Sequence, residues 1–287
     1  MARRWFSVTP VVGLLALIAV LATGCEPRAG ARPPGSPPPP ASSLPSSMAA
    51  LGDSITAGFG ACLALAACPR NSWSTGYGLR VDSHFKRIED GNSAIRGHAH
   101  NLAVPRARAV DLAGQAGGAV RQKVEYVTVL IGGNDICRGP VDQMTSPADF
   151  REQVDRALGV LKKGLPRARV LLASVPDLYR LWEIGHTNSH AVHVWSLGVC
   201  PALLANPQST AAADTRRRQA VRDRVSAYNA ALAAACKAYG ARCRYDGGAV
   251  HRTRFTLEML NVLDYFHPDA QGQDALARVT YPGRFAW

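Results

Sequence analysis

The sequence predicts an α/β fold, a three-layer sandwich in which helices cover both faces of a central parallel sheet. Short β-rich runs alternate with longer runs of helical periodicity, which is the pattern of parallel strands joined by helical crossovers. The run at 126–131, YVTVLI, is apolar on both faces, as a central parallel strand is. The 287 residues, of which 47% are hydrophobic, suffice for one large domain. The same composition excludes a wholly disordered, collagenous or multi-span membrane protein.

The first 25 residues have the pattern of an export signal. Arg3 and Arg4 precede an apolar stretch at 11–22, which is shorter than the roughly 20 residues that span hydrocarbon. The stretch leads into Ala22-Thr23-Gly24-Cys25, which resembles the lipobox of bacterial lipoproteins, where the cysteine is acylated and becomes the mature N-terminus. We therefore expect an exported chain. It is either anchored to the extracellular face of the cell membrane through a lipidated Cys25 or cleaved and secreted.

Residues 26–47 predict a linker. They hold eight prolines and almost no large apolar side chains, so they cannot build a packed core. A semi-extended tether directly after an anchor would hold a globular domain off a membrane. The folded domain is therefore expected to span residues 48–287.

Within this domain the elements follow from local pattern. One helix is expected after Ser146 and Pro147, a cap and a first-turn proline, and a second helix is expected over 221–239. Residues 181–214 have weak periodicity and are expected to form an insertion over the site. The charge run at 216–218 is expected to be a solvated helix face. The strands are expected at 48–51, 99–104, 126–131, 169–173 and 242–245.

Six cysteines remain beyond the signal. An even count in an exported chain favours disulfides over a metal site or a free nucleophile, and six cysteines allow 15 pairings. The spacing suggests two local loops and one long connection. The expected pairs are Cys62 with Cys68, Cys236 with Cys243, and Cys137 with Cys200.

The excess of basic residues indicates which classes of binding partner to expect. The 33 basic residues outnumber 21 acidic ones, and in an exported chain nucleic acid is not the expected partner. Anionic lipid heads, wall polymers or a merely solubilising surface fit better. His186, His190 and His193 are spaced for one helical face, but no HExxH accompanies them, and no metal site is expected.

Two motifs lie where strands of a parallel sheet end. Residues 51–58, LGDSITAG, follow the first strand directly, so Ser54 stands at its carboxyl end, where open α/β sheets bind ligands. Residues 132–135, GGND, follow the strand that ends at Ile131. The Asn134 carboxamide can donate a hydrogen bond to a charged oxygen without itself titrating.

A third motif lies near the C-terminus, where Asp264 precedes His267 by one helical turn. A serine hydroxyl is a poor nucleophile, so it needs an imidazole base, and the imidazole needs a carboxylate that fixes its tautomer. Asp264 and His267 can supply both groups from one loop. Asp269 follows the histidine and is expected to cap the next helix.

Taken together and in order, these motifs resemble the blocks of the SGNH (GDSL) hydrolases, most of all secreted actinobacterial esterases and lipases. The resemblance covers residues 48–276 and implies a flavodoxin-like three-layer sandwich, cleavage of small-molecule or lipid esters, and no cofactor. It implies Ser54, His267 and Asp264 as the catalytic triad. It also implies an oxyanion hole formed by the Ser54 amide, the Asn134 side chain and one further backbone amide. We expect a monomer.

That further amide is where the chain departs from the family. Residues 101–112 look like the family's second block, and the glycine position is Arg106. The backbone N–H survives the replacement, but a positive φ would be strained. If φ is ordinary instead, the guanidinium is placed to contact an anionic substrate group. An alternative function follows from this departure: a catalytically weak or inactive lipoprotein of the same fold that binds lipids or envelope polymers.

Overall fold

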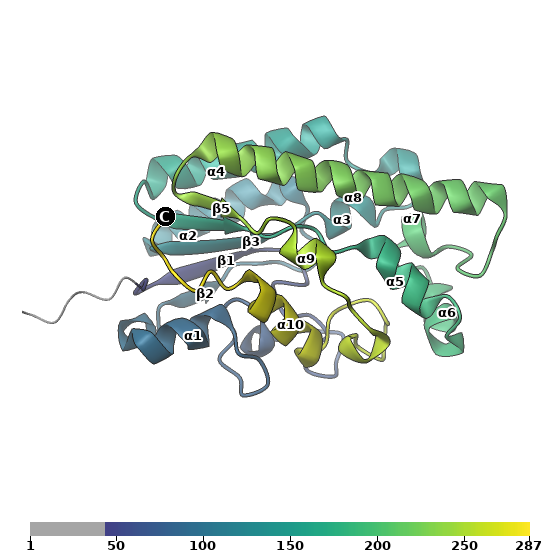
Figure 1. Ribbon diagram of the computed structural model, residues 1–287, viewed down its shortest axis with the longest axis horizontal. Coiled ribbons are helices and arrows are strands. Elements are labelled where there is room, and N and C mark those ends of the chain that lie inside the picture. The colour runs from purple at the N-terminus through teal and green to yellow at the C-terminus, as the bar shows by residue number, and fades with distance from the viewer. Residues whose placement is uncertain (1–43) are drawn as a thin grey trace, which may run out of the picture. The chain divides into compact units, whose positions relative to one another are not determined.

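The computed structural model describes residues 44–287, so the expected signal at 1–25, with Cys25, and most of the expected linker lie outside it. A five-stranded parallel sheet has the order β2-β1-β3-β4-β5 (Figure 1). All five expected strands are confirmed. Their bounds are β1 Met48–Gly52, β2 Ala99–Asn101, β3 Tyr126–Leu130, β4 Arg169–Leu172 and β5 Cys243–Tyr245.

Strand β2 is shorter than expected because the Asn101 side chain turns the backbone. Its Oδ1 accepts a hydrogen bond from the Ala103 N–H at 3.2 Å, the bond of an Asx turn. The chain then forms a tight turn at 104–107, in which the Ala107 N–H donates to the Val104 carbonyl.

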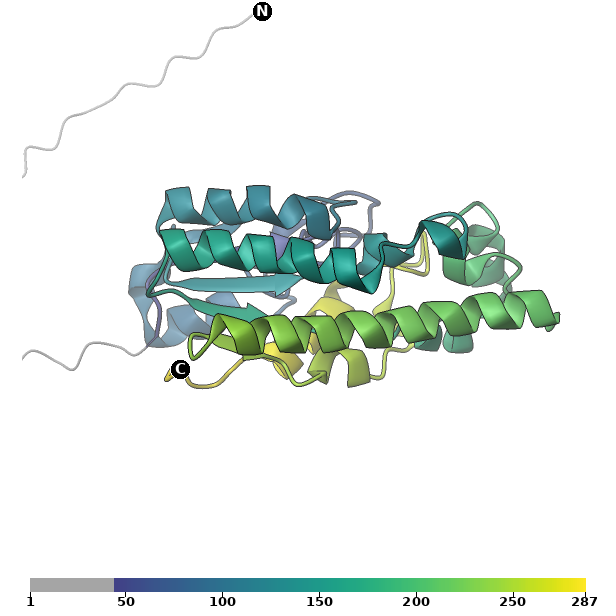
Figure 2. The same cartoon turned by 90° about the horizontal axis from the view of Figure 1, so that it is seen from above.

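The helices form two layers around the sheet (Figures 1 and 2). Helix α4 begins as expected, since the Ser146 hydroxyl accepts from the Asp149 N–H at 3.1 Å and Pro147 is its first residue. The helices are α1 His84–Gly91, α2 Leu112–Gln122, α3 Gly133–Ile136, α4 Pro147–Gly164, α5 Leu178–Gly185, α6 Ser189–Trp195, α7 Pro201–Leu204, α8 Ala212–Tyr239, α9 Ala249–Arg252 and α10 Ala270–Thr280.

Each face of the sheet packs a separate core. Alternate strand residues such as Leu51 and Val129 pack against α2, α4 and α8 on one face. Met48 and Leu130 point the other way, into a core shared with α1 and α10. The sheet is therefore buried on both sides, which is why its strands read as nearly continuous apolar runs.

The strand order places a crevice beside β1. From β1 the chain crosses to β2 on one side and then returns to β3 on the other. The segments that leave the carboxyl ends of β1 and β3 therefore diverge, and ligands of open α/β sheets bind at such a switch point. Ser54 follows β1 directly, and Asn134 lies on α3 directly after β3.

Residues 181–214, which were expected to form an insertion, are mostly helical although their sequence periodicity is weak. Helices α5, α6 and α7 and the start of α8 fill this segment. Trp195 is fully buried, and its indole N–H donates to the Tyr265 carbonyl at 3.2 Å. Helices of four to eight residues are too short to show helical periodicity in the windows that reveal it.

The expectation that residues 216–218 form a solvated helix face is wrong for two of the three arginines. Arg217 donates to the Ala202 carbonyl at 2.9 Å and to Asp214 at 2.9 Å, so it satisfies a carbonyl of α7. Arg218 is buried, with its guanidinium 4.4 Å from the centre of the Trp182 ring. Only Arg216 is exposed.

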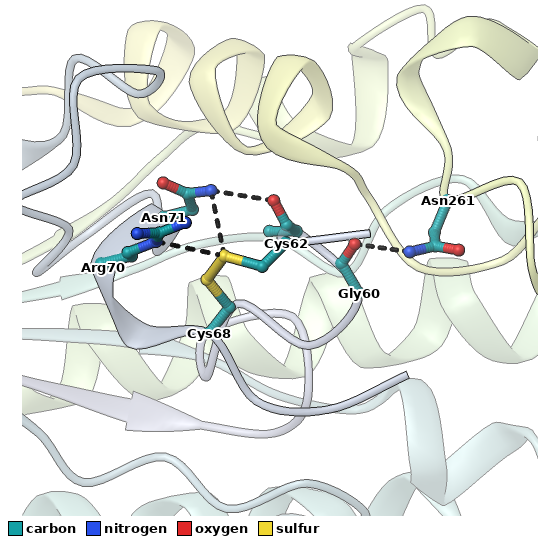
Figure 3. The surroundings of a disulfide bond; sticks show 7 residues. Gly60, Cys62, Cys68, Arg70, Asn71 and Asn261 are labelled. Atoms are coloured by element: carbon teal, nitrogen blue, oxygen red, sulfur yellow. Dashed lines mark hydrogen bonds between the residues drawn. A yellow bond between two sulfur atoms is a disulfide. The ribbon is translucent and has the colours of Figure 1, made fainter. Parts of the chain in front are cut away.

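Three disulfides join the cysteines in the pairs that their spacing predicts, Cys62–Cys68, Cys137–Cys200 and Cys236–Cys243. The first closes a surface loop after β1 (Figure 3). The second ties the end of α3 to the start of α7, and the third ties the end of α8 to β5. The connections around the carboxyl ends of β1 and β3 are thus covalently braced.

His186 lies just after α5, whereas His190 and His193 lie on α6, so one helical face does not hold all three. Among residues 44–287, no three His, Cys, Asp or Glu side chains are grouped so that they could hold a metal ion. None of the helices in this part of the chain combines the length and apolar content of a bilayer span.

Candidate active site

Three side chains that two separate motifs predicted are joined by hydrogen bonds. The Ser54 hydroxyl lies 2.9 Å from Nε2 of His267, and Nδ1 of His267 lies 2.6 Å from Oδ2 of Asp264. Ser54 is 7% exposed and Asp264 is 6% exposed. A hydroxyl paired with an imidazole in this way can pass its proton to the ring as its oxygen attacks a carbonyl carbon.

The loop that carries the histidine is held by its own carboxylate. Oδ1 of Asp264 accepts the backbone N–H of Phe266 at 2.9 Å and of His267 at 3.0 Å, which leaves Oδ2 for the imidazole. The Asn261 N–H donates to the His267 carbonyl at 2.8 Å. Asp269 caps α10, as expected, by accepting the Gly272 N–H at 2.9 Å.

The turn that carries Ser54 depends on Gly52. This residue has φ +145°, and a Cβ there would lie 2.1 Å from the Leu130 carbonyl oxygen, so only glycine fits. Gln115 of α2 holds its backbone at both ends: the Gly52 N–H donates to Oε1 at 2.7 Å, and Nε2 donates to the Gly52 carbonyl at 2.9 Å. Sequence reasoning missed Gln115, although a single amide on the apolar face of a helix was a usable signal.

Asn134 and the turn at 104–107 meet beside Ser54. One N–H of the Asn134 amide donates to the Ala107 carbonyl at 3.1 Å, and the Val104 N–H donates to the Gly52 carbonyl at 3.1 Å. Arg106 in this turn has φ +70° and an exposed side chain. The backbone is therefore in the left-handed region that favours glycine.

An expected result follows for Arg106→Gly. Removing the side chain at positive φ should raise the free energy of unfolding by about 1 kcal/mol. If the strain also turns the amide away from an oxyanion, kcat for a simple ester should rise with little change in KM. Denaturant unfolding and steady-state kinetics measure the two effects.

Lys123→Gly is the matched control for this variant. Lys123 ends α2 with φ +53°, away from Ser54, so its replacement should stabilise the fold to a similar degree and leave kcat unchanged. If Arg106→Gly behaves like Lys123→Gly in kinetics, the turn at 104–107 does not limit turnover.

A pocket opens beside Ser54, and its wall is mostly apolar. Helix α5 supplies Leu178 and Leu181, neither of which was named as a site residue from the sequence, although Leu181 begins the segment expected to lie over the site. Its polar lining residues Asp53, Ser54 and Asn134 lie just beyond the carboxyl ends of β1 and β3. The lining residues are Asp53, Ser54, Ile55, Gly133, Asn134, Pro176, Asp177, Leu178, Leu181, Phe255, Leu260, Phe266 and Pro268.

Asp53 is a buried carboxyl next to the serine that the motif did not single out. It is 1% exposed, and Oδ1 accepts the Ile55 N–H at 3.0 Å. Among the described residues none donates a hydrogen bond to its Oδ2. Burial raises the pKa of Asp53 from 3.8 to about 7, against the partly offsetting hydrogen bond from Ile55.

This shift predicts a pH dependence of stability. Between pH 3.8 and about 7 the folded chain keeps the Asp53 proton while the unfolded chain has released it. The contribution of Asp53 to stability is therefore complete below pH 3.8 and is lost as pH rises through about 7. Relative to Asp53→Asn, the parent should lose up to about 4 kcal/mol across this window, measured by urea unfolding.

The comparison with Asp53→Asn is needed because a second buried group acts in the opposite direction. Burial lowers the pKa of His84 from 6.5 to about 3, so the stability that depends on neutral His84 is lost as pH falls through this range. His84 is common to both proteins and cancels in the difference. A difference between parent and variant that does not change with pH would show that the pKa of Asp53 is not raised in the folded chain.

The chain belongs to the GDSL-like lipase/acylhydrolase family, whose model matches residues 50–275. Two curated relatives match it over less than half of its length. Phospholipase B1, membrane-associated, of Mus musculus is 30% identical over 177 residues, 47% of this chain and 11% of that protein. The Homo sapiens protein of the same name is 30% identical over 173 residues, 47% and 12% respectively. The chain thus spans about a tenth of these relatives' length.

Solved structures of low sequence identity are also similar to the chain. An extracellular lipase from Streptomyces rimosus is 19% identical with a TM-score of 0.49, and the match covers 81% of this chain and 97% of that one. A phospholipase A1 from Streptomyces albidoflavus NA297 is 17% identical with a TM-score of 0.48, at the same coverage.

Proposed function

We propose that the chain is an extracytoplasmic serine hydrolase that cleaves carboxylic esters. The proposal rests on one observation. Two hydrogen bonds link Ser54, His267 and Asp264 at the switch point of the sheet, although Ser54 lies more than 200 residues before the other two. A series of this kind activates a hydroxyl for attack on an acyl carbon.

In the proposed reaction the Ser54 oxygen attacks the carbonyl carbon while Nε2 of His267 takes the hydroxyl proton. Asp264 stabilises the imidazolium that forms. The Ser54 amide, the second N–H of Asn134 and the Arg106 amide donate to the oxyanion. His267 then returns its proton to the leaving alcohol, and a water molecule, activated in the same way, releases the acid from Ser54.

The substrate class proposed is an ester with an apolar acyl chain. Leu178, Leu181, Phe255, Leu260 and Phe266 line the pocket beside Ser54, and an apolar wall favours a hydrocarbon over a hydrated sugar. The mouse and human relatives are named as phospholipases, which favours a lipid ester as the physiological substrate.

The place of action is proposed to be outside the cytoplasm. Three disulfides support an oxidising compartment. Lipidation of Cys25, with residues 26–47 as the tether, would place the domain at the extracellular face of the membrane, and without lipidation it would be secreted. We propose that it acts as a monomer.

A p-nitrophenyl ester series tests the proposed function. The purified chain should hydrolyse esters of four to eight acyl carbons faster than the acetate, because the longer chains fill the apolar pocket. A phosphonate ester should stop turnover and add its mass at Ser54. Vesicle or polymer binding without hydrolysis of any ester would favour the alternative, a binding lipoprotein.

A further inference from the structure

Large apolar side chains are exposed on one side of the site, in a pattern that the ester chemistry does not require. Among the described residues ten large apolar side chains are exposed, and six of them lie in two neighbouring segments. We call these six the apolar surface. They are Leu63, Leu65, Tyr77, Leu79, Val262 and Leu263.

The centre of this surface is the loop closed by Cys62–Cys68. Its tip, residues 63–67 with the sequence LALAA, is exposed along its whole length. Leu63 is 70% exposed and has φ +63°, a conformation that costs a leucine free energy. A tip without a polar side chain, kept in water by the fold, marks an interaction site.

Two buried amides hold the base of the loop through hydrogen bonds (Figure 3). The Asn71 amide donates to the Ala61 carbonyl at 2.8 Å, and the Asn261 amide donates to the Gly60 carbonyl at 2.5 Å. Both asparagines are buried, so these bonds fix the base of the loop rather than solvate it. The base of the loop is therefore held in place, and the tip at 63–67 lies exposed rather than packed on the core.

The same bonds join the loop to the neighbouring segments. Asn261 immediately precedes Val262 and Leu263, which lead into Asp264. The Gly78 N–H donates to the Arg70 carbonyl at 2.7 Å, which places Tyr77 and Leu79 beside the loop. Leu79 is 95% exposed.

The charges of this region indicate the partner. Residues 63–80 contain Arg70 and Arg80, both exposed, and no acidic residue, and the next carboxylate along the chain, Asp82, is paired with Arg87 at 3.0 Å. Exposed leucines flanked by a tyrosine and arginines have the composition of segments that lie in a bilayer interface, with apolar side chains in the acyl region and arginines at anionic headgroups.

We propose that the apolar surface docks the domain on a phospholipid bilayer that carries anionic headgroups. Because the surface is continuous with the loop of Asp264 and His267, docking brings the proposed active site to its lipid substrate. The activity arm of the test rests on the proposed function, whereas the binding arm does not.

The binding arm uses the full chain with Ser54→Ala, so that no lipid is cleaved, and a tryptophan reporter at Leu79. Vesicles of phosphatidylcholine and phosphatidylglycerol brominated in the acyl chains should quench the added emission of Leu79→Trp. The matched control, Val110→Trp, replaces an exposed valine outside the surface and should not be quenched. A lipid anchor at Cys25 affects both proteins equally. Equal quenching of both reporters, or of neither, would overturn the proposal.

The activity arm compares Leu63→Ser combined with Leu79→Ser against the parent. Hydrolysis of an ester embedded in vesicles should fall by about tenfold or more, and hydrolysis of a dissolved short-chain ester should be unchanged. Val110→Ser combined with Val279→Ser serves as control. An equal loss on both substrates would contradict lipid docking. So would a concentration-dependent dimer that the leucine variant abolishes, since the surface would then bind a second copy. Absence of any esterase activity would defeat the proposed function and leave the binding arm to decide.

Discussion

Ser54→Ala is expected to lower kcat for a p-nitrophenyl ester by about 10⁴-fold or more, with little change in KM. The variant loses the oxygen that bonds to the acyl carbon, and no other hydroxyl lies within hydrogen-bond distance of Nε2 of His267 among the described residues. Removal of one partly buried hydroxyl should change the free energy of unfolding by no more than about 1 kcal/mol. Activity assays and denaturant unfolding on one preparation separate the two effects.

Ser226→Ala is the matched control for this result. Ser226 lies on α8 and donates only to the Arg222 carbonyl, one turn earlier, at 3.1 Å. It should keep full activity and full stability. A purified Ser54→Ala protein with more than a few per cent of parental activity would end the serine-hydrolase proposal.

The fold could be predicted because its signals are local. Strands buried on both faces, such as the one at 126–131, are continuous apolar runs. The start of α4 is marked in the sequence by the cap Ser146 and the first-turn Pro147. The three disulfide pairs were predicted from the even cysteine count, the export signal and the spacing of the cysteines. The segment 181–214 could not be predicted, because its helices are short and are fixed by long-range contacts of Trp182 and Trp195 rather than by their own periodicity.

The residues of the candidate active site could be predicted in part from the sequence. Motifs identify the residues that need a particular functional group, and Ser54, Asn134, Asp264 and His267 do lie around one crevice. Motifs do not reveal groups whose importance comes from burial. Asp53 reads as a spacer within the motif, yet its carboxyl lies beside the serine with one oxygen that no described residue hydrogen-bonds.

At Arg106 the sequence shows the unusual residue but not the backbone conformation that makes it important. The departure from glycine was visible in the sequence, but the sign of φ was not, because a side chain does not by itself determine which region its backbone occupies. The turn is fixed from outside, by the bonds of Val104 to Gly52 and of Ala107 to Asn134. These contacts hold Arg106 at φ +70° although arginine disfavours it.

Asp264→Asn is expected to lower kcat by about 10³- to 10⁴-fold while the loop keeps its shape. The asparagine oxygen still accepts the N–H groups of Phe266 and His267 that Oδ1 accepts now, at 2.9 and 3.0 Å. The amide nitrogen then replaces Oδ2, 2.6 Å from Nδ1 of His267, and donates a hydrogen where the carboxylate accepted one. The imidazole proton therefore moves to Nε2, and a protonated Nε2 does not accept the proton of Ser54.

Asp269→Asn provides a matched control for this tautomer argument, because it makes the same chemical change two residues beyond His267. Asparagine caps helices as well as aspartate, so α10 and the activity should both be preserved. NMR shifts of the ring nitrogens should show the hydrogen of His267 on Nδ1 in the parent and in Asp269→Asn, and on Nε2 in Asp264→Asn. If Asp264→Asn loses activity with its tautomer unchanged, Asp264 acts only through the charge that it presents to the imidazolium. If Asp264→Asn keeps its activity, the reaction does not need the hydrogen bond from Nδ1 of His267 to Asp264.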